Sequence, residues 1–206
     1  MYFKCLDNGI FGSNSYIIWS ENSKDALLID AGVDSQSIMS VLDSNELILK
    51  KIILTHYHFD HVYYLNEIKN LTNAQILIHG LDKIGLSDPK INGSSHFSKP
   101  ETFYEPNKTL KDNETFTCAN LEFKVLHTPG HTKGCICVLV ESSVFTGDTL
   151  FKGSMGRTDL PGAQPEKIIP SIKNKLYTLP PNTRVYPGHG GSSTIDFEIR
   201  YNKVVQ

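Results

Sequence analysis

The stretch Thr55-His56-Tyr57-His58-Phe59-Asp60-His61 follows directly on the apolar run Lys51-Ile52-Ile53-Leu54. Its three imidazoles and one carboxylate lie within six residues, and such groups are nitrogen and oxygen ligands for a borderline metal such as zinc or iron. A histidine-rich polar loop is the alternative, but histidine is uncommon and buried imidazoles need partners. The stretch therefore predicts a metal site.

The spacing of these donors predicts more than one ion. Residues i and i+2 of an extended segment point to the same side, so His56 and His58 can bind one ion together. Asp60 and His61 lie just beyond, where we expect the backbone to turn into a helix, and they are placed for a second ion. Seven consecutive residues cannot complete a site of three or four donors, so further ligands are expected downstream.

Three downstream donors occur in similar local settings. His131 lies in Thr128-Pro129-Gly130-His131-Thr132, Asp148 in residues 145–149, and His189 in residues 186–191. Each follows an apolar, strand-like run and stands beside a glycine, as expected for side chains presented from strand ends on tight turns. Together, and in this order, they predict the missing ligands.

These motifs resemble those of the metallo-beta-lactamase superfamily, and the likeness covers nearly the whole chain. The His-x-His-x-Asp-His pattern of residues 56–61, with His131, Asp148 and His189, carries it. Residues 147–151 (Gly-Asp-Thr-Leu-Phe) and 153–162 (Gly-Ser-Met-Gly-Arg-Thr-Asp-Leu-Pro-Gly) are similar to the glyoxalase II-like branch, the hydroxyacylglutathione hydrolases. Within that branch the chain looks most like the short bacterial members, which lack the C-terminal helical domain.

The resemblance implies both a ligand set and a fold. It assigns His56, His58 and His131 to one metal, Asp60, His61 and His189 to the other, and Asp148 to both. The implied fold is α/β (α+β), a four-layer αβ/βα sandwich of two mixed sheets with helices on the outer faces. The metals would lie at one edge between the sheets. We expect two divalent ions, with zinc as the first choice, because the donor set also accepts iron or manganese.

The pattern along the chain agrees with two halves, each of strands backed by helices. Strands are predicted at residues 2–6, 15–19, 26–30, 51–54, 75–78, 115–117, 121–126, 136–140, 144–146 and 184–186. Helices are predicted after a cap at Asp34 or Ser35, from Val62 to Leu71, over residues 165–179 and over residues 195–203. Pro170 inside the third of these predicts a kink or a late start.

Residues 80–108 lose this periodicity, and such a long irregular segment suggests a loop near the site, acting as a lid over the substrate. Asp30, at a strand end before a glycine, is read as a turn residue or as a residue that supports the ligands. His127 is read in the same way. His79 and His96 have no second donor at chelating distance in sequence, so no metal role is expected for them.

Composition narrows the class of protein. The 206 residues carry no linker or break in composition, so we expect one domain over residues 1–206. Twenty basic residues nearly balance 22 acidic ones without a run of five like charges, which argues against nucleic-acid and membrane partners. A small-molecule substrate is expected, and the oligomeric state is left open.

The chain begins without a basic segment followed by an apolar one, and no apolar stretch reaches the roughly 18 residues that a membrane span needs. We therefore expect a cytoplasmic protein. Its four cysteines, Cys5, Cys118, Cys135 and Cys137, show no CxxC spacing and are expected to pack as small core residues.

Two divalent ions bridged by a carboxylate can share one water and lower its pKa, which makes hydroxide available as a nucleophile. An ion also takes up charge on the tetrahedral oxyanion, and Asp60 is the expected catalytic residue, orienting the water or carrying its proton. A thioester suits this apparatus, because its thiolate leaving group has a pKa of about 8.5 and needs little protonation. The branch resemblance also implies a thioester such as S-2-hydroxyacylglutathione.

Substrate contacts are less defined by the sequence. Lys152 and Arg157 are the cations nearest the bridging Asp148 in sequence and could meet a substrate carboxylate. Arg157 could instead pair with Asp159 and brace its own loop, which is the reading we favour.

One other function is kept as an alternative, and two more are disfavoured. Persulfide dioxygenases of the superfamily also resemble the run Gly156-Arg157-Thr158-Asp159, and they use a single iron whose ligands would correspond to His56, His131 and Asp148. A non-enzymatic metal-binding module is disfavoured, because two linked sites are costly to assemble without catalytic use. A true beta-lactamase is disfavoured by the start of the chain, which resembles no export signal.

Overall fold

Two six-stranded sheets form the centre of the molecule in the computed structural model, which describes residues 1–97 and 99–205. The first sheet consists, in spatial order, of β1 (Tyr2–Leu6), β2 (Ser15–Trp19), β3 (Asp25–Ile29), β4 (Ile48–Ile53), β5 (Gln75–His79) and β6 (Lys108–Leu110). The second consists of β14 (Ser193–Thr194), β13 (Arg184–Pro187), β10 (Ser143–Gly147), β9 (Ile136–Val140), β8 (Leu121–His127) and β7 (Thr115–Cys118). A separate hairpin pairs β11 (Leu150–Phe151) with β12 (Ser154–Met155).

Both sheets are mixed, as predicted. In the first, β1, β2 and β3 pair antiparallel, whereas β3, β4, β5 and β6 run parallel. In the second, β10 and β13 run parallel and the other neighbours pair antiparallel. A parallel pair needs a crossover connection, and helices supply it on the outer faces.

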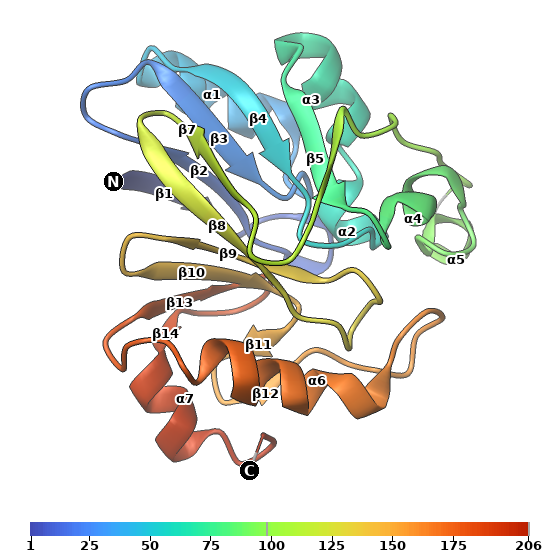
Figure 1. The fold of residues 1–206 in the computed structure, drawn as a ribbon. Coiled ribbons are helices and arrows are strands. Elements are labelled where there is room, and N and C mark those ends of the chain that lie inside the picture. The colour runs from blue at the N-terminus through green and yellow to red at the C-terminus, as the bar shows by residue number, and fades with distance from the viewer. Residues whose placement is uncertain (98, 206) are drawn as a thin grey trace.

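Helices cover the outer face of each sheet, and Figure 1 shows them on opposite sides of the molecule. Helices α1 (Ser35–Ser44) and α3 (Leu65–Thr72) pack on the first sheet. Helix α6 (Pro165–Ser171), its continuation η2 (Ile172–Leu176) and α7 (Ile195–Tyr201) pack on the second. This αβ/βα sandwich is the predicted fold.

Strand β3 shows why the layers form. Its residues are apolar on both faces, and successive side chains point to opposite sides of the sheet. Leu28 faces α1 and α3, whereas Leu27 and Ile29 face the second sheet, and all three are buried. The molecule therefore has one core between the sheets and one beneath the helices of each half.

The predicted helix from Val62 to Leu71 is divided in the structure. A short helix, α2 (Phe59–Val62), ends before α3 begins. The amide of Ala31 donates to the carbonyl of His61 at 2.7 Å, and the amide of Tyr64 donates to the carbonyl of Ala31 at 2.9 Å. These contacts with the turn after β3 occupy backbone groups that a continuous helix would use, and periodicity alone does not reveal them.

Two further predictions need correction, one of a helix and one of an irregular segment. The helix predicted over residues 165–179 is α-helical only to Ser171 and continues as the π-helical segment η2 to Leu176. Pro170 lacks the amide that a regular turn needs, so the predicted kink takes the form of this wider turn. The segment 80–108, predicted to be irregular, contains the short helices α4 (Lys83–Ser87) and α5 (Ser94–Phe97).

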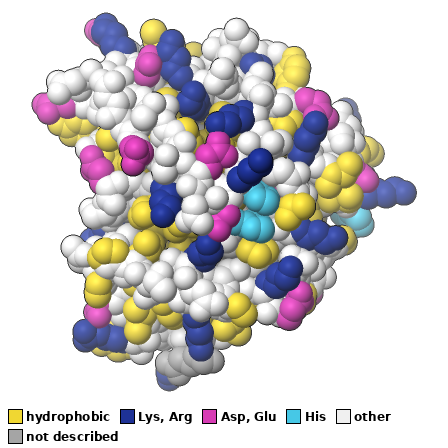
Figure 2. Space-filling model, viewed as in Figure 1, with side chains coloured by type: hydrophobic (Ala, Val, Ile, Leu, Met, Phe, Trp, Pro, Cys, Tyr) yellow, Lys and Arg dark blue, Asp and Glu magenta, His cyan; other side chains and the backbone are white. Residues whose placement is uncertain are grey.

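Within the described part of the chain, every helix falls short of the length and apolar character that crossing a bilayer requires. Figure 2 shows basic and acidic side chains interspersed with apolar ones on one face of the molecule. The four cysteines are free thiols. Cys118, Cys135 and Cys137 are buried, as predicted for core residues, but Cys5 is exposed on the edge strand β1, so the prediction is wrong for Cys5.

Candidate metal centre

Four of the predicted ligands follow β4. The strand ends at Ile53, residues 54–58 are extended or irregular, and α2 begins at Phe59. His56 and His61 are fully buried, and His58 is 7% exposed. Asp60 lies in the first turn of α2, which is where the sequence placed the change from extended to helical backbone.

The other three predicted ligands come from the second half of the chain. His131 lies in the loop between β8 and β9, Asp148 directly follows β10, and His189 follows β13. Gly147 has a left-handed φ of 47°, and a Cβ there would overlap the side chain of Thr55. The glycine before Asp148 thus lets the end of β10 approach the end of β4.

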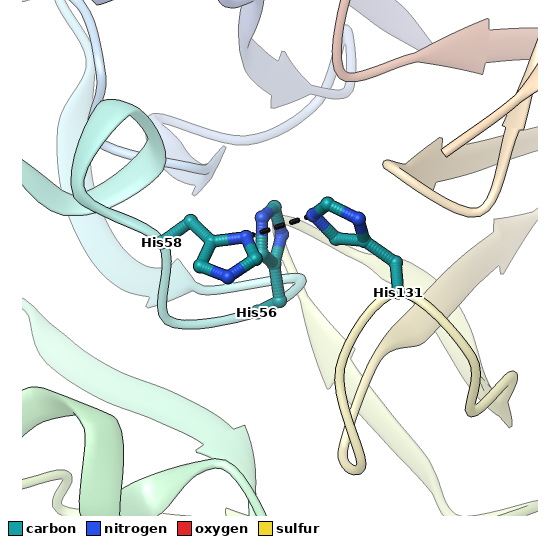
Figure 3. A group of neighbouring side chains, drawn as sticks. All are labelled: His56, His58 and His131. Atoms are coloured by element: carbon teal, nitrogen blue, oxygen red, sulfur yellow. Dashed lines mark hydrogen bonds between the residues drawn. The ribbon is translucent and has the colours of Figure 1, made fainter. Parts of the chain in front are cut away.

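The structure brings all seven side chains together in three overlapping groups, and within each group the ligand atoms lie within 4.8 Å of one another. The groups are His56, His58 and His131; His56, His61 and Asp148; and Asp60, His61 and His189. Figure 3 shows the rings of the first group converging from two parts of the chain. In it, His58 Nδ1 lies 2.8 Å from His131 Nε2.

Asp148 lies between the two ends of this cluster. Its Oδ1 is 3.2 Å from His61 Nε2, and its Oδ2 is 3.5 Å from His131 Nε2 and 3.7 Å from His189 Nε2. On the far side, Asp60 Oδ2 lies 3.0 Å from His189 Nε2. A carboxylate that reaches histidines of both ends has the position that a bridging ligand requires.

Neighbouring groups orient the imidazoles. Asp30 Oδ2 accepts from His61 Nδ1 at 2.9 Å, and the carbonyl of Arg157 accepts from His131 Nδ1 at 2.7 Å. Thr55 Oγ1 donates to Asp30 at 2.8 Å, which leaves the same oxygen to accept from His56 Nδ1 at 3.0 Å. With Nδ1 as the donor in each case, Nε2 is the ring nitrogen that faces the cluster and is available to a metal.

Asp30 therefore supports the ligands, as its place at a strand end predicted. Its carboxylate also accepts the backbone amide of Thr55 at 2.7 Å, and it is 1% exposed. Its backbone adopts a left-handed φ of 58°, a strained conformation for a residue other than glycine. The contacts with Thr55 and His61 hold it there.

The electrostatics of the cluster suit a cation. Burial lowers the pKa of His56 well below its ordinary value, and burial with the nearby His131 lowers the pKa of His58 to about 3. Burial opposes ionisation of Asp148, but His61 and His131 hold its pKa well below the usual range. At neutral pH these groups are neutral imidazoles and a carboxylate, which are the forms that bind metals.

Two buried atoms provide a further test of whether these residues fit bound metal ions. His56 Nε2 and Asp148 Oδ1 have no hydrogen-bond partner among the described residues, although buried polar atoms are nearly always paired. Burial disfavours a charged His61, yet Asp148, Asp60 and Asp30 raise its pKa well above the ordinary value. Metal-binding atoms that lack hydrogen-bond partners and are surrounded by carboxylates fit a pair of divalent cations.

A cavity of about 680 Å³ opens onto this cluster. Five of the seven donors line it: His58, Asp60, His131, Asp148 and His189. Residues 90–93 and Phe97 from the predicted irregular segment also line it, so that segment does lie near the site. Phe11, in the short helix η1 (Ile10–Gly12), was not singled out from the sequence.

The two basic side chains that were considered as contacts for a substrate carboxylate have other partners. Arg157 donates to Asp159 through two hydrogen bonds of 2.7 Å each, so the bracing role favoured from the sequence is the observed one. Lys152 Nζ lies 5.6 Å from the ring centre of Phe197, and Lys152 does not line the cavity.

The remaining histidines lie outside the three groups of possible ligands. The ring of His79 stacks on that of His127 with centres 4.1 Å apart, and the amide of His127 donates to Asp112. His127 ends β8, directly before the ligand loop, and its Nε2 lies 2.9 Å from the carbonyl oxygen of Lys133 in that loop, so it has the structural role expected of it. His96 lines the cavity.

Asp82 was not singled out from the sequence. It is fully buried and accepts from Thr132 Oγ1 and from the amide of Gly134, both at 2.6 Å. It thereby anchors the loop that carries His131, and burial raises its pKa to about 7. No local motif marks this role, because its partners lie about fifty residues downstream.

Comparison with known proteins gives consistent matches. The family model described as "Metallo-beta-lactamase superfamily" matches residues 8–189. The structure is similar to the crystal structure of the BLEG-1 B3 metallo-beta-lactamase, with a TM-score of 0.93 and 33% identity over 98% of each chain. It is also similar to TTHA1623 in a di-iron-bound form, with a TM-score of 0.87 and 32% identity over 97% of this chain and 98% of that one.

A relative with a named activity is hydroxyacylglutathione hydrolase GloC of Haemophilus influenzae. It is 32% identical over 196 residues, which cover 93% of this chain and 92% of the relative.

Proposed function

The chain belongs to the metallo-beta-lactamase superfamily, and from this premise we propose that it is a dinuclear metallohydrolase that cleaves thioesters such as S-2-hydroxyacylglutathione. The observation that carries the proposal is the convergence of seven donors from both halves of the chain into overlapping groups. The di-iron form of TTHA1623 and the named activity of GloC support it.

We assign the ligands as the resemblance implies. One ion would be held by His56, His58 and His131, the other by Asp60, His61 and His189, and Asp148 would contribute to both. When bound, the ions would supply a water of lowered pKa as the nucleophile and a Lewis acid for the thioester carbonyl. Zinc, iron and manganese all accept this donor set.

The protein's own residues would prepare the reaction. Asp60 lines the cavity, and its Oδ2 is 3.0 Å from His189 Nε2, so its carboxylate is placed to orient the attacking water and take its proton. Asp30, Thr55 and the carbonyl of Arg157 keep three rings in the ligating tautomer. A thioester is the favoured substrate class because a thiolate of pKa about 8.5 leaves with little protonation.

Elemental analysis combined with two assays tests this proposal. We expect two divalent ions per chain in the purified protein, and hydrolysis of S-lactoylglutathione or of a simple thioester that stops when the metals are removed. Protein that carries both ions and leaves every thioester of the panel intact would contradict thioester hydrolysis. One iron per chain, together with oxygen uptake on glutathione persulfide, would instead identify a persulfide dioxygenase.

A further inference from the structure

Apolar side chains form most of the cavity wall around the donors. They come from η1, from the segment that includes α5, from the β11–β12 hairpin and from the loop after it. The lining residues used below are Phe11, Ile91, Phe97, Phe151, Met155 and Leu160. A wall of this kind binds by removing apolar surface from water, whereas a few polar groups fix the orientation of the ligand.

Two phenylalanines of this wall are largely exposed to solvent although their rings contact each other. Phe11 and Phe97 are each 63% exposed, and their rings meet edge to face with centres 5.1 Å apart. They are 86 positions apart in the sequence, so tertiary structure alone brings them together. Exposed aromatic surface beside a cavity is typical of a place where a ligand packs.

The backbone at Phe11 strengthens this point. Phe11 has a left-handed φ of 54°, which is unusual for a bulky residue and costs conformational energy. The strain directs a large apolar side chain to the cavity, where it remains mostly in contact with water. A strained, exposed aromatic residue in a binding cavity points to a role in holding a ligand.

The charges of the cavity wall fit a large anionic carrier poorly. Glutathione carries two carboxylates at neutral pH, and each would seek a cation. Arg157 is occupied by Asp159, and Lys152 lies on Phe197 outside the cavity. Lys90 lines the cavity, is exposed and forms no ion pair with the described residues. Of the two cations that line the cavity, Arg157 is paired with Asp159, and Lys90 is the one without an ion pair among the described residues.

We propose that this cavity selects thioesters with an apolar acyl group, such as an aryl or medium-length alkyl chain, over those with a small 2-hydroxyacyl group. The inference rests on the proposed function and narrows its substrate class. In the reaction, the oxygen of water bonds to the acyl carbon and the carbon–sulfur bond breaks. One proton of the water ends on the released thiol, and the acyl group leaves as a carboxylic acid that ionises.

The test compares two acyl groups on one small neutral thiol. The phenylacetyl and lactoyl thioesters of N-acetylcysteamine are assayed with the metal-loaded enzyme, and their kcat/KM values are compared. We expect roughly a 10-fold or larger preference for the phenylacetyl thioester, because even one methylene in an apolar pocket is worth about that much. Equal rates, or a preference for lactoyl, would overturn the inference while leaving thioester hydrolysis intact.

Variants of Phe11 and Phe97 test whether these two side chains cause the preference for the phenylacetyl thioester. Phe11→Ala and Phe97→Ala should each reduce the phenylacetyl-to-lactoyl ratio several-fold, whereas Phe97→Leu, which stays apolar, should retain most of it. Tyr201→Ala is a matched control, because Tyr201 is 61% exposed and packs on Phe197 at 5.2 Å but does not line the cavity. Unchanged ratios in both alanine variants would contradict the role of the pair.

A binding measurement keeps the inference testable if hydrolysis is absent. Calorimetry of the metal-loaded protein with phenylacetate and with lactate should show tighter binding of phenylacetate, and Phe97→Ala should weaken that binding selectively. If no thioester is cleaved but phenylacetate binds more tightly, the proposed reaction fails and the cavity preference stands. If lactate binds as tightly as phenylacetate, the cavity preference fails whatever the reaction.

Discussion

Asp30 accepts three hydrogen bonds beside the candidate metal centre through one carboxylate. It accepts from the amide and the hydroxyl of Thr55 and from His61 Nδ1, so it fixes both the strand end that carries His56 and the ring of a second ligand. The sequence showed only a carboxylate before a glycine. Which groups it contacts depends on how β3 lies beside β4, which is a property of the folded sheet.

We predict that Asp30→Asn lowers metal affinity by about 10- to 100-fold, the usual cost of losing a carboxylate behind a ligating imidazole. The amide is nearly isosteric, so the fold should persist while one of the three hydrogen bonds is lost. Competition with a chelating dye measures the affinity. Asp25→Asn, at the exposed start of the same strand, should bind metal as the unmodified protein does, and equal affinities in all three proteins would contradict the prediction.

His79 gives a prediction about pH. Burial and the stacked His127 lower the pKa of His79 to about 4. In the unfolded chain the imidazole takes up a proton below about pH 6.5, whereas in the folded protein it does so only near pH 4. Its contribution to stability is therefore complete above pH 6.5 and is lost as the pH falls toward 4.

We predict that His79→Gln removes this part of the pH dependence. Between pH 7 and pH 5 the free energy of unfolding should fall by up to about 2 kcal/mol more in the unmodified protein than in the variant. Urea unfolding at both pH values, with metal removed, provides the measurement. The exposed His96→Gln should behave as the unmodified protein does, and parallel pH curves for His79→Gln would show the prediction to be wrong.

At the scale of elements, the hairpin after Asp148 is held close to the predicted metal ligands. Gly156 follows β12, and a Cβ at this position would overlap the carbonyl oxygen of Asp148 and lie 3.3 Å from the ring of His131. The hairpin can approach Asp148 only because this position has no side chain. The run Gly156-Arg157-Thr158-Asp159, which carried part of the family resemblance, thus has a packing role as well.

We predict that Gly156→Ala destabilises the protein by about 1–3 kcal/mol, as overpacking of a tight contact does, and lowers metal content. The backbone of Asp148 must shift to make room, and a shift there moves both carboxylate oxygens. Thermal unfolding and elemental analysis of the variant test this. Gly191→Ala is the control, since a Cβ there meets open space, and indistinguishable variants would refute the argument.

The elements show where sequence patterns suffice and where they do not. The ten predicted strands are present with ends that differ by a few residues, because most of them are apolar runs of four or more residues. The short strands β6, β11, β12 and β14 were missed, since two or three residues carry no periodicity. The break between α2 and α3 was missed because Ala31, on another segment, takes up the backbone groups.

At the scale of the molecule, the centre joins the two halves of the sandwich. The first four donors follow β4 in the first sheet, and the last three follow β8, β10 and β13 in the second. The predicted ligands converge because strand ends of both sheets meet at one edge. The cavity wall was not predictable in this way, because Phe11 and Phe97 belong to short segments without a motif and meet only in the folded chain.

We predict that removing the metals lowers the melting temperature substantially. Ions that bind only the folded protein at about 100 times their dissociation constant add about 2.7 kcal/mol of stability. For a chain of this size that corresponds to roughly 5–10 °C. Scanning calorimetry with and without a chelator measures the difference, re-addition of zinc should restore it, and an unchanged melting temperature would argue against metals that connect the two sheets.

The loop that carries His189 is fastened to the beginning of the chain. The side chain of Asn14 donates to the carbonyls of Pro187 and Gly190, and its backbone amide donates to the carbonyl of Gly188. His61 and His189 are 128 positions apart, so at about 5–20 residues per second a ribosome takes roughly 6–26 s to pass from one to the other. During that interval the nascent polypeptide presents an incomplete set of the predicted ligands, and binding of both metals would have to await the synthesis of residue 189.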